Sequence, residues 1–312
     1  MNILTNALEL GATMYIPATH ENLWDVTQGI KYPELKSVVV CLEDAVREDD
    51  YEKALENLNC LFKRIAMNDG KESGPAIFIR PRNIDSGYQI LDLGYEDFYN
   101  GFVVPKFTLD TLDEWKACTE NQSNVMLTLE TGEYFDSGYL SEVKYALCED
   151  FNENVLCLRI GGNDLLSSIN LCRPRECTIY DTPIGSLIPK LVGNFVPKGF
   201  QLSSPVFEHY SNVELLKQEL ALDNANGLTT KTAIHPIQLK LIHEAYKVCS
   251  VDYYEAQMIV DAQAKSVFKS NGSMLEPATH RNWANEILLR AKIYGVIENY
   301  LQVLNHPTKQ AI

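Results

Sequence analysis

The sequence predicts a (β/α)₈ barrel with additional C-terminal helices, and three observations lead to this fold class. Short β-rich runs recur along the chain with helical spacing between most of them, which indicates a parallel sheet. Several runs, notably SVVVCL and NVLCLRI, are apolar at nearly every position, as strands buried on both faces require. Eight such units fit a closed barrel better than an open sheet. The expected strands cover residues 13–16, 38–42, 76–80, 101–104, 125–129, 155–160, 201–203 and 230–234.

The segment 51–66 is the clearest helix between these strands. Its apolar side chains recur every three or four residues and share one face, as an amphipathic helix packed on a sheet requires. The apolar face comprises Leu55, Leu58, Leu61, Phe62 and Ile65, and the opposite face comprises Glu52, Lys53, Glu56, Lys63 and Arg64.

Beyond residue 235 the pattern becomes almost wholly helical. Asp252 and Glu255 form a capping box that starts a predicted helix through about Phe268, and Asn271-Gly272 then provides a C-cap. A final helix is expected over 281–304. We therefore expect a barrel domain over 1–245, and a helical extension over 246–312 that packs on the barrel or on a neighbouring subunit.

Composition excludes several classes of partner. The net charge of −15 argues against nucleic acid, because phosphate binding needs clustered Lys and Arg. No apolar run approaches the length that spans a bilayer, and MNILTNALELGATMY lacks the pattern of a secretory signal. The eight cysteines include no C-x-x-C pair, so neither a zinc site nor a disulfide framework is indicated. We expect a cytoplasmic protein with reduced thiols.

Acidic, basic or catalytic-type residues follow most of the predicted strands, at the edge where barrel active sites lie. One such residue would be an ordinary solvated turn, but their recurrence at most of the strand ends favours a site. These residues are Glu43, Asp44, Arg80, Arg82, Lys106, Glu130, Gly161 to Asp164, Glu208 and His235.

Glu130 and Asp164 follow successive strands, whose ends are neighbours in a barrel. Two carboxylates brought together repel each other unless a cation lies between them or one is protonated. Mg²⁺ held by two carboxylates, waters and substrate oxygens satisfies this arrangement. The alternative is that Glu130 starts a helix and Asp164 is an N-cap. Arg80 would bind a substrate carboxylate through its fork, or else form a salt bridge in the barrel mouth.

The motifs SVVVCLEDAV, FIRPRN, VVPK, TLET, RIGGNDL and KTAIHPIQ, in this order, resemble the HpcH/HpaI aldolase and citrate lyase β-subunit superfamily. The likeness spans nearly the whole chain. GATMYIPATH, TIYDTPIG, SPVFE and MLEPATHRNWA resemble one branch of it, the C–C bond lyase-like proteins found alongside tellurium-resistance and stress-response genes.

This resemblance implies a homo-oligomeric barrel, trimeric or hexameric, that cleaves or forms a C–C bond through a metal-stabilised enolate. It implies that Glu130 and Asp164 hold Mg²⁺, with Mn²⁺ as an alternative. Arg80 would contact substrate oxygens, and Glu43 and Asp44 would line the site. The general base stays open among Glu43, Asp44 and a metal-bound water.

Further residues are candidates for substrate binding. Gly162 allows close approach of the backbone, and Glu208 and His235 lie at later strand ends. Lys106 is a candidate for substrate binding or Schiff-base chemistry, which metal-type aldolases do not need, or else forms a structural ion pair. Arg82 stands where relatives have Asn and adds a cation, which favours a more negatively charged substrate. No element demands coenzyme A, so a thioester substrate stays open.

Two functions from different classes fit these observations. One is a Mg²⁺-dependent C–C bond lyase acting on a small oxo-acid or acyl thioester. The other is a non-catalytic barrel that binds a small acidic metabolite or serves as a subunit of a stress-linked biosynthetic complex. Glu130, Asp164 and Arg80 together favour the lyase, because a scaffold needs none of them.

Overall fold

The structure is a computed structural model that describes residues 4–68, 74–122, 124–151 and 154–298. The chain divides into two compact units, residues 1–242 and 243–312. The sequence-based boundary after residue 245 lies close to this division, and the packing partner of the C-terminal unit stays a prediction.

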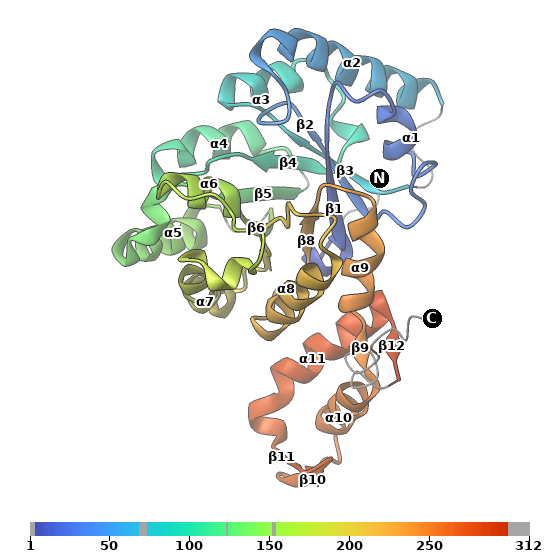
Figure 1. The fold of residues 1–312 in the computed structure, drawn as a ribbon, viewed down its shortest axis with the longest axis vertical. Coiled ribbons are helices and arrows are strands. Elements are labelled where there is room, and N and C mark those ends of the chain that lie inside the picture. The colour runs from blue at the N-terminus through green and yellow to red at the C-terminus, as the bar shows by residue number, and fades with distance from the viewer. Residues whose placement is uncertain (1–3, 69–73, 123, 152–153, 299–312) are drawn as a thin grey trace. The chain divides into compact units, whose positions relative to one another are not determined.

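The first unit is the predicted barrel, and its eight strands are all parallel (Figure 1). The sheet runs β7-β6-β5-β4-β3-β2-β1-β8, and a parallel bridge between Ser204 and Lys231 joins its two edges. The strands are β1 Ala12–Pro17, β2 Ser37–Cys41, β3 Ala76–Arg80, β4 Gly101–Val104, β5 Asn124–Leu129, β6 Val155–Ile160, β7 Leu202–Ser203 and β8 Lys231–Ala233. All eight expected strands are therefore present.

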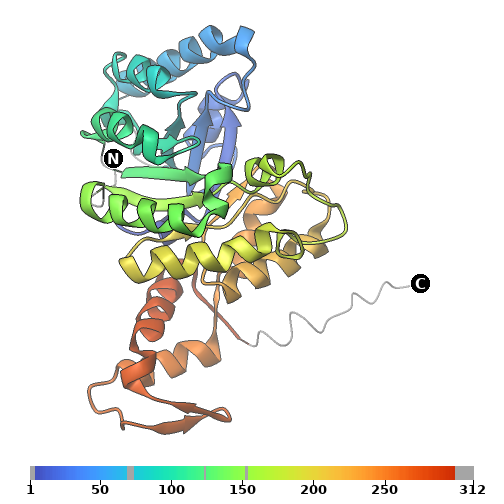
Figure 2. The same ribbon diagram turned by 90° about the vertical axis from the view of Figure 1, so that its left-hand side faces the viewer.

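Helices surround the strands on the outside (Figure 2). They are α1 Leu23–Thr27, α2 Tyr51–Met67, α3 Ile84–Leu91, α4 Leu112–Thr119, α5 Ser137–Asp150, α6 Gly162–Ser168, α7 Ile184–Phe195, α8 Val213–Ala225 and α9 Ile237–Ala245. Short 3₁₀ helices cover Ala7–Leu10, Glu48–Asp50, Glu96–Phe98, Leu109–Thr111, Gly132–Phe135, Ile179–Asp181 and Val196–Lys198. The amphipathic pattern over 51–66 forms α2, which buries Leu58, Leu61, Phe62 and Ile65. No helix in the described part of the chain is long and apolar enough to cross a membrane.

The barrel interior is apolar in its lower part and polar towards the carboxyl ends of the strands. Val39, Phe78, Met126 and Cys157 pack together in the lower part, one from each of β2, β3, β5 and β6. Side chains two residues apart on a strand share a face. The next inward positions are therefore Cys41, Arg80, Thr128 and Arg159, which form a second layer above the apolar one.

The second unit contains short strands as well as helices. Its elements are β9 Val248–Cys249, α10 Ser250–Val260, β10 Phe268–Ser270, β11 Ser273–Leu275, α11 Pro277–Tyr294 and β12 Val296–Ile297. The two helices pack on each other through a small core that includes Ala256, Ile259, Ala284 and Ile287.

The sequence-based prediction of this unit was partly wrong. The first helix begins at Ser250, so Asp252 lies within its first turn rather than at its cap, and it ends at Val260 instead of reaching Phe268. Asn271 and Gly272, with φ of 46° and 82°, form the turn of the β10–β11 hairpin. Asn-Gly is the preferred pair for such a turn, so it marks a hairpin here and not a helix end.

The last helix also differs from its prediction over 281–304. It begins at Pro277, because proline lacks the N–H that the first helical position does not use, and it ends at Tyr294. Residues 299–304 of the prediction lie outside the described part of the chain.

Candidate functional site

A cavity of about 490 Å³ opens at the carboxyl ends of the barrel strands. Its deep part is the polar layer described above, since Cys41, Arg80, Thr128 and Arg159 all line it. Asp44, Glu130, Gly162 and Asp164, all predicted from the sequence, line the same cavity. A hollow of about 860 Å³ beside α4 and α5 contains none of the predicted site residues.

Arg80 is the centre of a charged cluster in this cavity. Its Nη2 lies 2.9 Å from Glu43 Oε2, 2.9 Å from Glu130 Oε1 and 3.5 Å from Asp44 Oδ2. Arg80, Glu43 and Glu130 are each less than 10% exposed. Burial raises the pKa of Glu130, and the positive charge of Arg80 opposes this. The predicted salt bridge of Arg80 is thus present, and it places the guanidinium against two buried carboxylates.

Lys106 completes the cluster from the end of β4. Its Nζ pairs with Glu43 and lies 3.3 Å from Asp44 Oδ1 and 3.7 Å from Asp164 Oδ1. Its backbone N–H donates to Glu130 Oε1 at 2.7 Å. Lys106 has a φ of 45°, a conformation that costs a non-glycine residue energy and recurs at functional sites. The ion pairs agree with the structural interpretation of Lys106, and they also hold its ammonium group in the site.

Glu43 and Asp44 have opposite pKa shifts. Burial and the hydrogen bond with Asp44 raise the pKa of Glu43 to about 7, against the positive charges of Arg80 and Lys106. For Asp44, burial is outweighed by the hydrogen bond with Glu43 and by the same two cations, so its pKa is lowered. Neighbouring carboxyl groups whose pKa values differ in this way can take up and release one proton near neutral pH.

Two glycines let the start of α6 pack closely against Glu130 on one side and Ile179 on the other. A Cβ atom on Gly161 would lie 2.3 Å from Glu130 Cβ, and one on Gly162 would lie 2.7 Å from Ile179 Cδ1. Gly161 is the N-cap of α6, so the alternative of Asp164 as an N-cap is wrong. Asp164 lies in the first turn instead, with its side chain 34% exposed at the cavity mouth.

Glu130 and Asp164 suit a divalent cation that keeps part of its water shell. Among the described residues, no group of three or more His, Cys, Asp and Glu side chains could hold a metal alone. Mg²⁺ is usually bound through one or two carboxylates together with waters and substrate oxygens, so two carboxylates fit it. The cluster holds four carboxyl groups, of Glu43, Asp44, Glu130 and Asp164, beside two cations, and a divalent cation would relieve the repulsion among them.

Five predicted site residues are not among those that line the cavity. Two of them, Glu43 and Lys106, belong to the cluster around Arg80, and the other three make different contacts. The Arg82 guanidinium donates to Leu42 O at 3.3 Å and Val46 O at 2.8 Å and pairs with Glu48, so it fastens the segment after β2. His235 stacks on Tyr210 with ring centroids 4.3 Å apart. Glu208 Oε2 is buried with no hydrogen-bond partner among the described residues. Substrate contacts by these three residues stay predictions.

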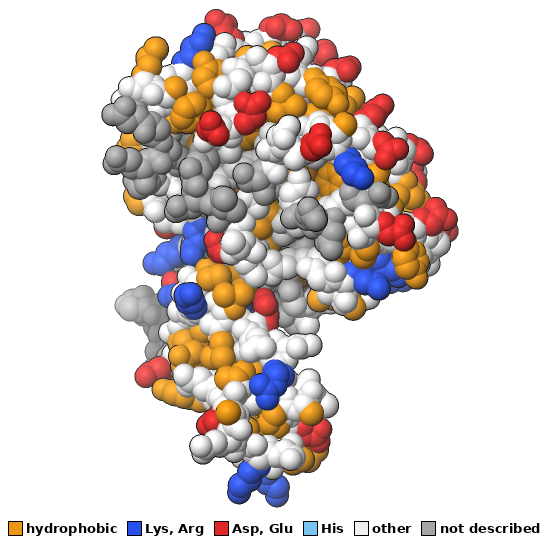
Figure 3. Space-filling view, turned by 180° about the vertical axis from the view of Figure 1, so that it is seen from behind, with side chains coloured by type: hydrophobic (Ala, Val, Ile, Leu, Met, Phe, Trp, Pro, Cys, Tyr) orange, Lys and Arg blue, Asp and Glu red, His pale blue; other side chains and the backbone are white. Residues whose placement is uncertain are grey.

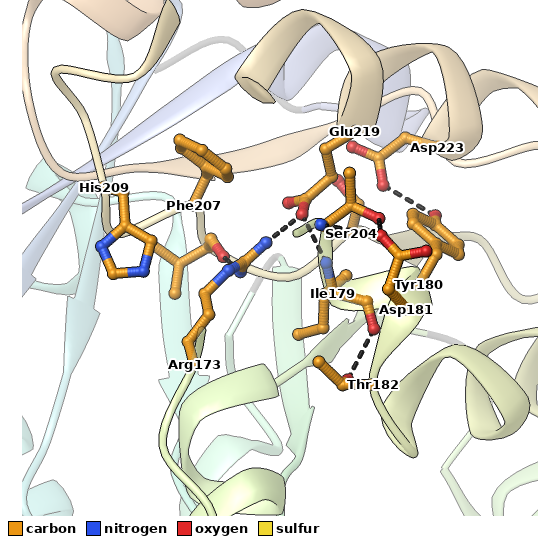
Figure 4. A network of polar contacts seen from close by, with 12 residues as sticks. Arg173, Ile179, Tyr180, Asp181, Thr182, Ser204, Phe207, His209, Glu219 and Asp223 are labelled. Atoms are coloured by element: carbon orange, nitrogen blue, oxygen red, sulfur yellow. Dashed lines mark hydrogen bonds and ion pairs between the residues drawn. The ribbon is translucent and has the colours of Figure 1, made fainter. Parts of the chain in front are cut away.

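A buried ionic network holds the wall of the cavity beside Gly162 (Figure 4). Arg173 donates to Val206 O at 2.7 Å and pairs with Glu219, and Glu219 accepts from the Ile179 N–H at 2.9 Å. Lys231 on β8 lies 3.0 Å from Glu219 Oε1 and 2.9 Å from Asp223 Oδ2. These contacts join the segment after α6 to α8 and β8, and thereby position Val206 and Ile179.

Arg159, Thr128 and Thr232 also line the cavity, although none of them was predicted as a site residue from the sequence. They lie inside the strands, whereas the predicted site residues end a strand or follow one. The available signal was the arginine within the otherwise apolar run NVLCLRI. Burying a charged residue at an inward position of a barrel strand costs free energy, so such a residue is expected to have a binding or structural role.

The sequence matches the model of a family described as C–C bond lyases of the TIM-barrel fold over residues 4–296. Among curated proteins, none matches closely enough to count as a relative.

Several solved structures have the same fold. A citrate lyase from Burkholderia xenovorans LB400 has a TM-score of 0.72 at 17% identity, over 93% of this chain and 94% of that one. CitE from Mycobacterium tuberculosis, in complex with magnesium, acetoacetate and coenzyme A, has a TM-score of 0.65 at 18% identity, over 90% and 98%. The citrate lyase beta subunit from the same organism, complexed with oxaloacetate and magnesium, has a TM-score of 0.56 at 17% identity, over 77% and 98%. At these identities the likeness establishes the fold.

Proposed function

The chain belongs to the C–C bond lyase family of the TIM-barrel fold, and on this premise we propose that it is a Mg²⁺-dependent carbon–carbon bond lyase acting on a small oxo-acid. One observation carries the proposal: Glu130, Asp164 and Arg80 come from three separate strand ends and meet in one cavity. Structural neighbours that contain magnesium with oxaloacetate or acetoacetate support this chemistry.

Glu130 and Asp164 would hold the cation. When bound, it would supply Lewis-acid stabilisation of the negative oxygen that forms as the C–C bond breaks. Arg80 adds fixed positive charge in a buried setting, where it acts more strongly than in water. Its position is maintained by Glu43 and Glu130, each 2.9 Å away. Arg80 therefore contributes to binding and to charge stabilisation without needing to move far.

The Glu43–Asp44 pair is our candidate for proton transfer. In the cleavage direction the oxo-acid would carry a hydroxyl group beta to its carbonyl, and a base removes the proton of that hydroxyl. The hydroxyl carbon then becomes a carbonyl as the C–C bond breaks, and the other fragment leaves as an enolate that takes up a proton. A base acts best when its pKa lies near the working pH, and Glu43 has a pKa raised to about 7. Lys106, which pairs with both carboxyl groups, orients them.

The metal site is tested by titrating the protein with Mn²⁺ and measuring the free ion by electron paramagnetic resonance, with Mg²⁺ as competitor. We expect Asp164→Asn and Glu130→Gln each to weaken binding about tenfold or more, because each removes one of two anionic ligands. Glu133→Gln is the matched control, since Glu133 is exposed and three residues from Glu130. Equal Mn²⁺ affinity in wild type and both variants would rule the site out.

A non-catalytic barrel that binds an acidic metabolite is the alternative from another class. No contact in the described part of the cavity favours it over the lyase, because a binding module needs no pair of carboxylates with opposite pKa shifts beside a cation site. The cytoplasmic location, the use of Mn²⁺ or coenzyme A and the link to tellurium resistance stay predictions.

A further inference from the structure

The geometry points to Arg159 as a second anion-binding residue of the cavity. We infer that the substrate of this cavity is compact and carries two anionic groups. One group binds deep in the barrel at Arg159, and the reacting end lies at Arg80 and the two carboxylates. The placement of the reacting end rests on the proposed function, whereas the deep anion site does not.

Arg159 is a buried cation without an anionic partner. Only 2% of the residue is exposed, and no ion pair within the described part of the chain includes it. Its Nη2 donates to Thr232 Oγ1 at 2.6 Å, its Nη1 lies 3.4 Å from Met126 Sδ, and its guanidinium lies 5.4 Å from the centre of the Tyr15 ring. All these partners are neutral, so no carboxylate of the described residues contacts the guanidinium.

Other buried arginines of the barrel unit are paired. Arg80 contacts Glu43 and Glu130, and Arg173 contacts Glu219. A buried charge costs several kcal/mol unless it is paired, so a purely structural arginine would be expected to have a carboxylate beside it. Arg159 lacks one while lining an open cavity, which is the arrangement expected when a ligand supplies the anion.

Two further polar atoms in this cavity lack partners. Thr128 Oγ1 and Arg80 Nε are buried and make no hydrogen bond among the described residues. Thr128 is paired in register with Arg159 across β5 and β6, and Arg80 belongs to the same layer. Buried polar groups are almost always satisfied, so these atoms indicate where ligand oxygens bind. Ligand oxygens that reach Thr128 Oγ1 and Arg80 Nε would satisfy these two atoms.

The deep position also limits the chemistry of the ligand. Thr128, Thr232 and Tyr15 come from strands β5, β8 and β1, so the group at Arg159 is enclosed by the barrel wall. A small planar carboxylate matches the guanidinium fork there. We therefore assign the substrate to short dicarboxylic oxo-acids, with the second carboxylate free and not bound as a thioester.

The test compares acids that differ only in one carboxylate. Oxaloacetate and 2-oxobutyrate share a four-carbon skeleton, with a carboxylate in one replaced by methyl in the other, and 2-oxoglutarate and 2-oxopentanoate form the five-carbon pair. Calorimetry with Mg²⁺ present should show wild type binding one dicarboxylate at least about tenfold more tightly than its partner, since hydrogen bonds to a buried charge are strong. Arg159→Met should abolish this preference, and Arg159→Lys should keep part of it.

Arg47→Met, at an exposed arginine, is the matched control and should keep the full preference. Mn²⁺ binding should be unchanged in Arg159→Met, because Arg159 does not hold the metal. Asp164→Asn tests the metal site of the proposed function, so the two proposals can fail independently. No preference in wild type, or an unchanged preference in Arg159→Met, would overturn the inference. A lower melting temperature with unchanged selectivity would show that Arg159 is structural.

Discussion

The pKa of Glu43 illustrates how the surroundings in this site change the acidity of a single side chain. It is 7% exposed and lies between Arg80 and Lys106, yet burial and Asp44 raise its pKa from 4.5 to about 7. The folded protein therefore binds the Glu43 proton more tightly than the unfolded chain does. The stabilising contribution of that proton is full below pH 4.5 and is lost as the pH rises towards 7.

This shift predicts a pH-dependent difference between wild type and Glu43→Gln. The variant carries no titratable group at position 43, so its stability relative to wild type should increase as the pH rises from about 5 to about 7.5. Urea unfolding with a chelator present measures the difference at each pH. Glu56→Gln, on the exposed face of α2, should show no such trend. A constant difference for Glu43→Gln would show that the pKa is not raised.

The site residues show what the sequence reveals and what it hides. Glu130, Asp164 and Arg80 were predicted because each follows or ends an apolar strand, and the carboxyl ends of parallel strands meet at one edge. Arg82 was interpreted as facing the same site, but it points to the carbonyl groups of Leu42 and Val46. The direction of a side chain beyond a strand depends on tertiary contacts, which no local pattern encodes.

At the scale of elements, the start of β4 leaves no room for a side chain beside β5. Gly101, at the start of β4, has a φ of 149°, and a Cβ atom there would lie 1.6 Å from Asn124 O. These strands pair from Gly101 with Asn124 to Val104 with Leu127, which brings Lys106 beside Glu130. The close approach at one end of the pair therefore supports the position of the site at the other.

We expect Gly101→Ala to destabilise the protein by about 3 kcal/mol or more, because the clash involves backbone atoms that cannot give way. Gly193→Ala is the matched control, since Gly193 is exposed on α7 and a Cβ atom there would meet no other atom within 4 Å. It should stabilise the protein by about 0.5–1 kcal/mol through helix propensity. Urea unfolding measures both, and near-equal stabilities would contradict the close packing of β4 on β5.

The length and apolar pattern of an element decide whether it can be predicted from the sequence. Most of the barrel strands are largely apolar, so their number and approximate limits follow from the sequence. The β10–β11 hairpin was missed because its strands are three residues each and half exposed, which leaves Asn271-Gly272 as the only strong signal. That pair was assigned to a helix end, a role in which Asn and Gly are also common.

At the scale of the whole molecule, two surface features are relevant to assembly: the distribution of acidic side chains and an exposed apolar face of α10. The net charge is −15, and on the face in Figure 3 the acidic side chains are scattered over the barrel unit and not gathered in one patch. Within the C-terminal unit, Tyr254 and Met258 are 62% and 41% exposed and lie one turn apart on α10. An apolar helix face of this kind fits contact with a second copy of the chain, in accord with the homo-oligomer that the family resemblance implies.

Sedimentation velocity at micromolar concentration should therefore show a homo-oligomer, with a trimer or hexamer expected. Tyr254→Glu with Met258→Glu should shift the protein towards smaller species, because two carboxylates would be buried in the contact. Gln263→Glu with Asn282→Asp adds the same charge at exposed positions outside α10, and should leave the assembly unchanged. A monomeric wild type would contradict oligomerisation, and an oligomer that resists the first pair of substitutions would exclude this face of α10 from the interface.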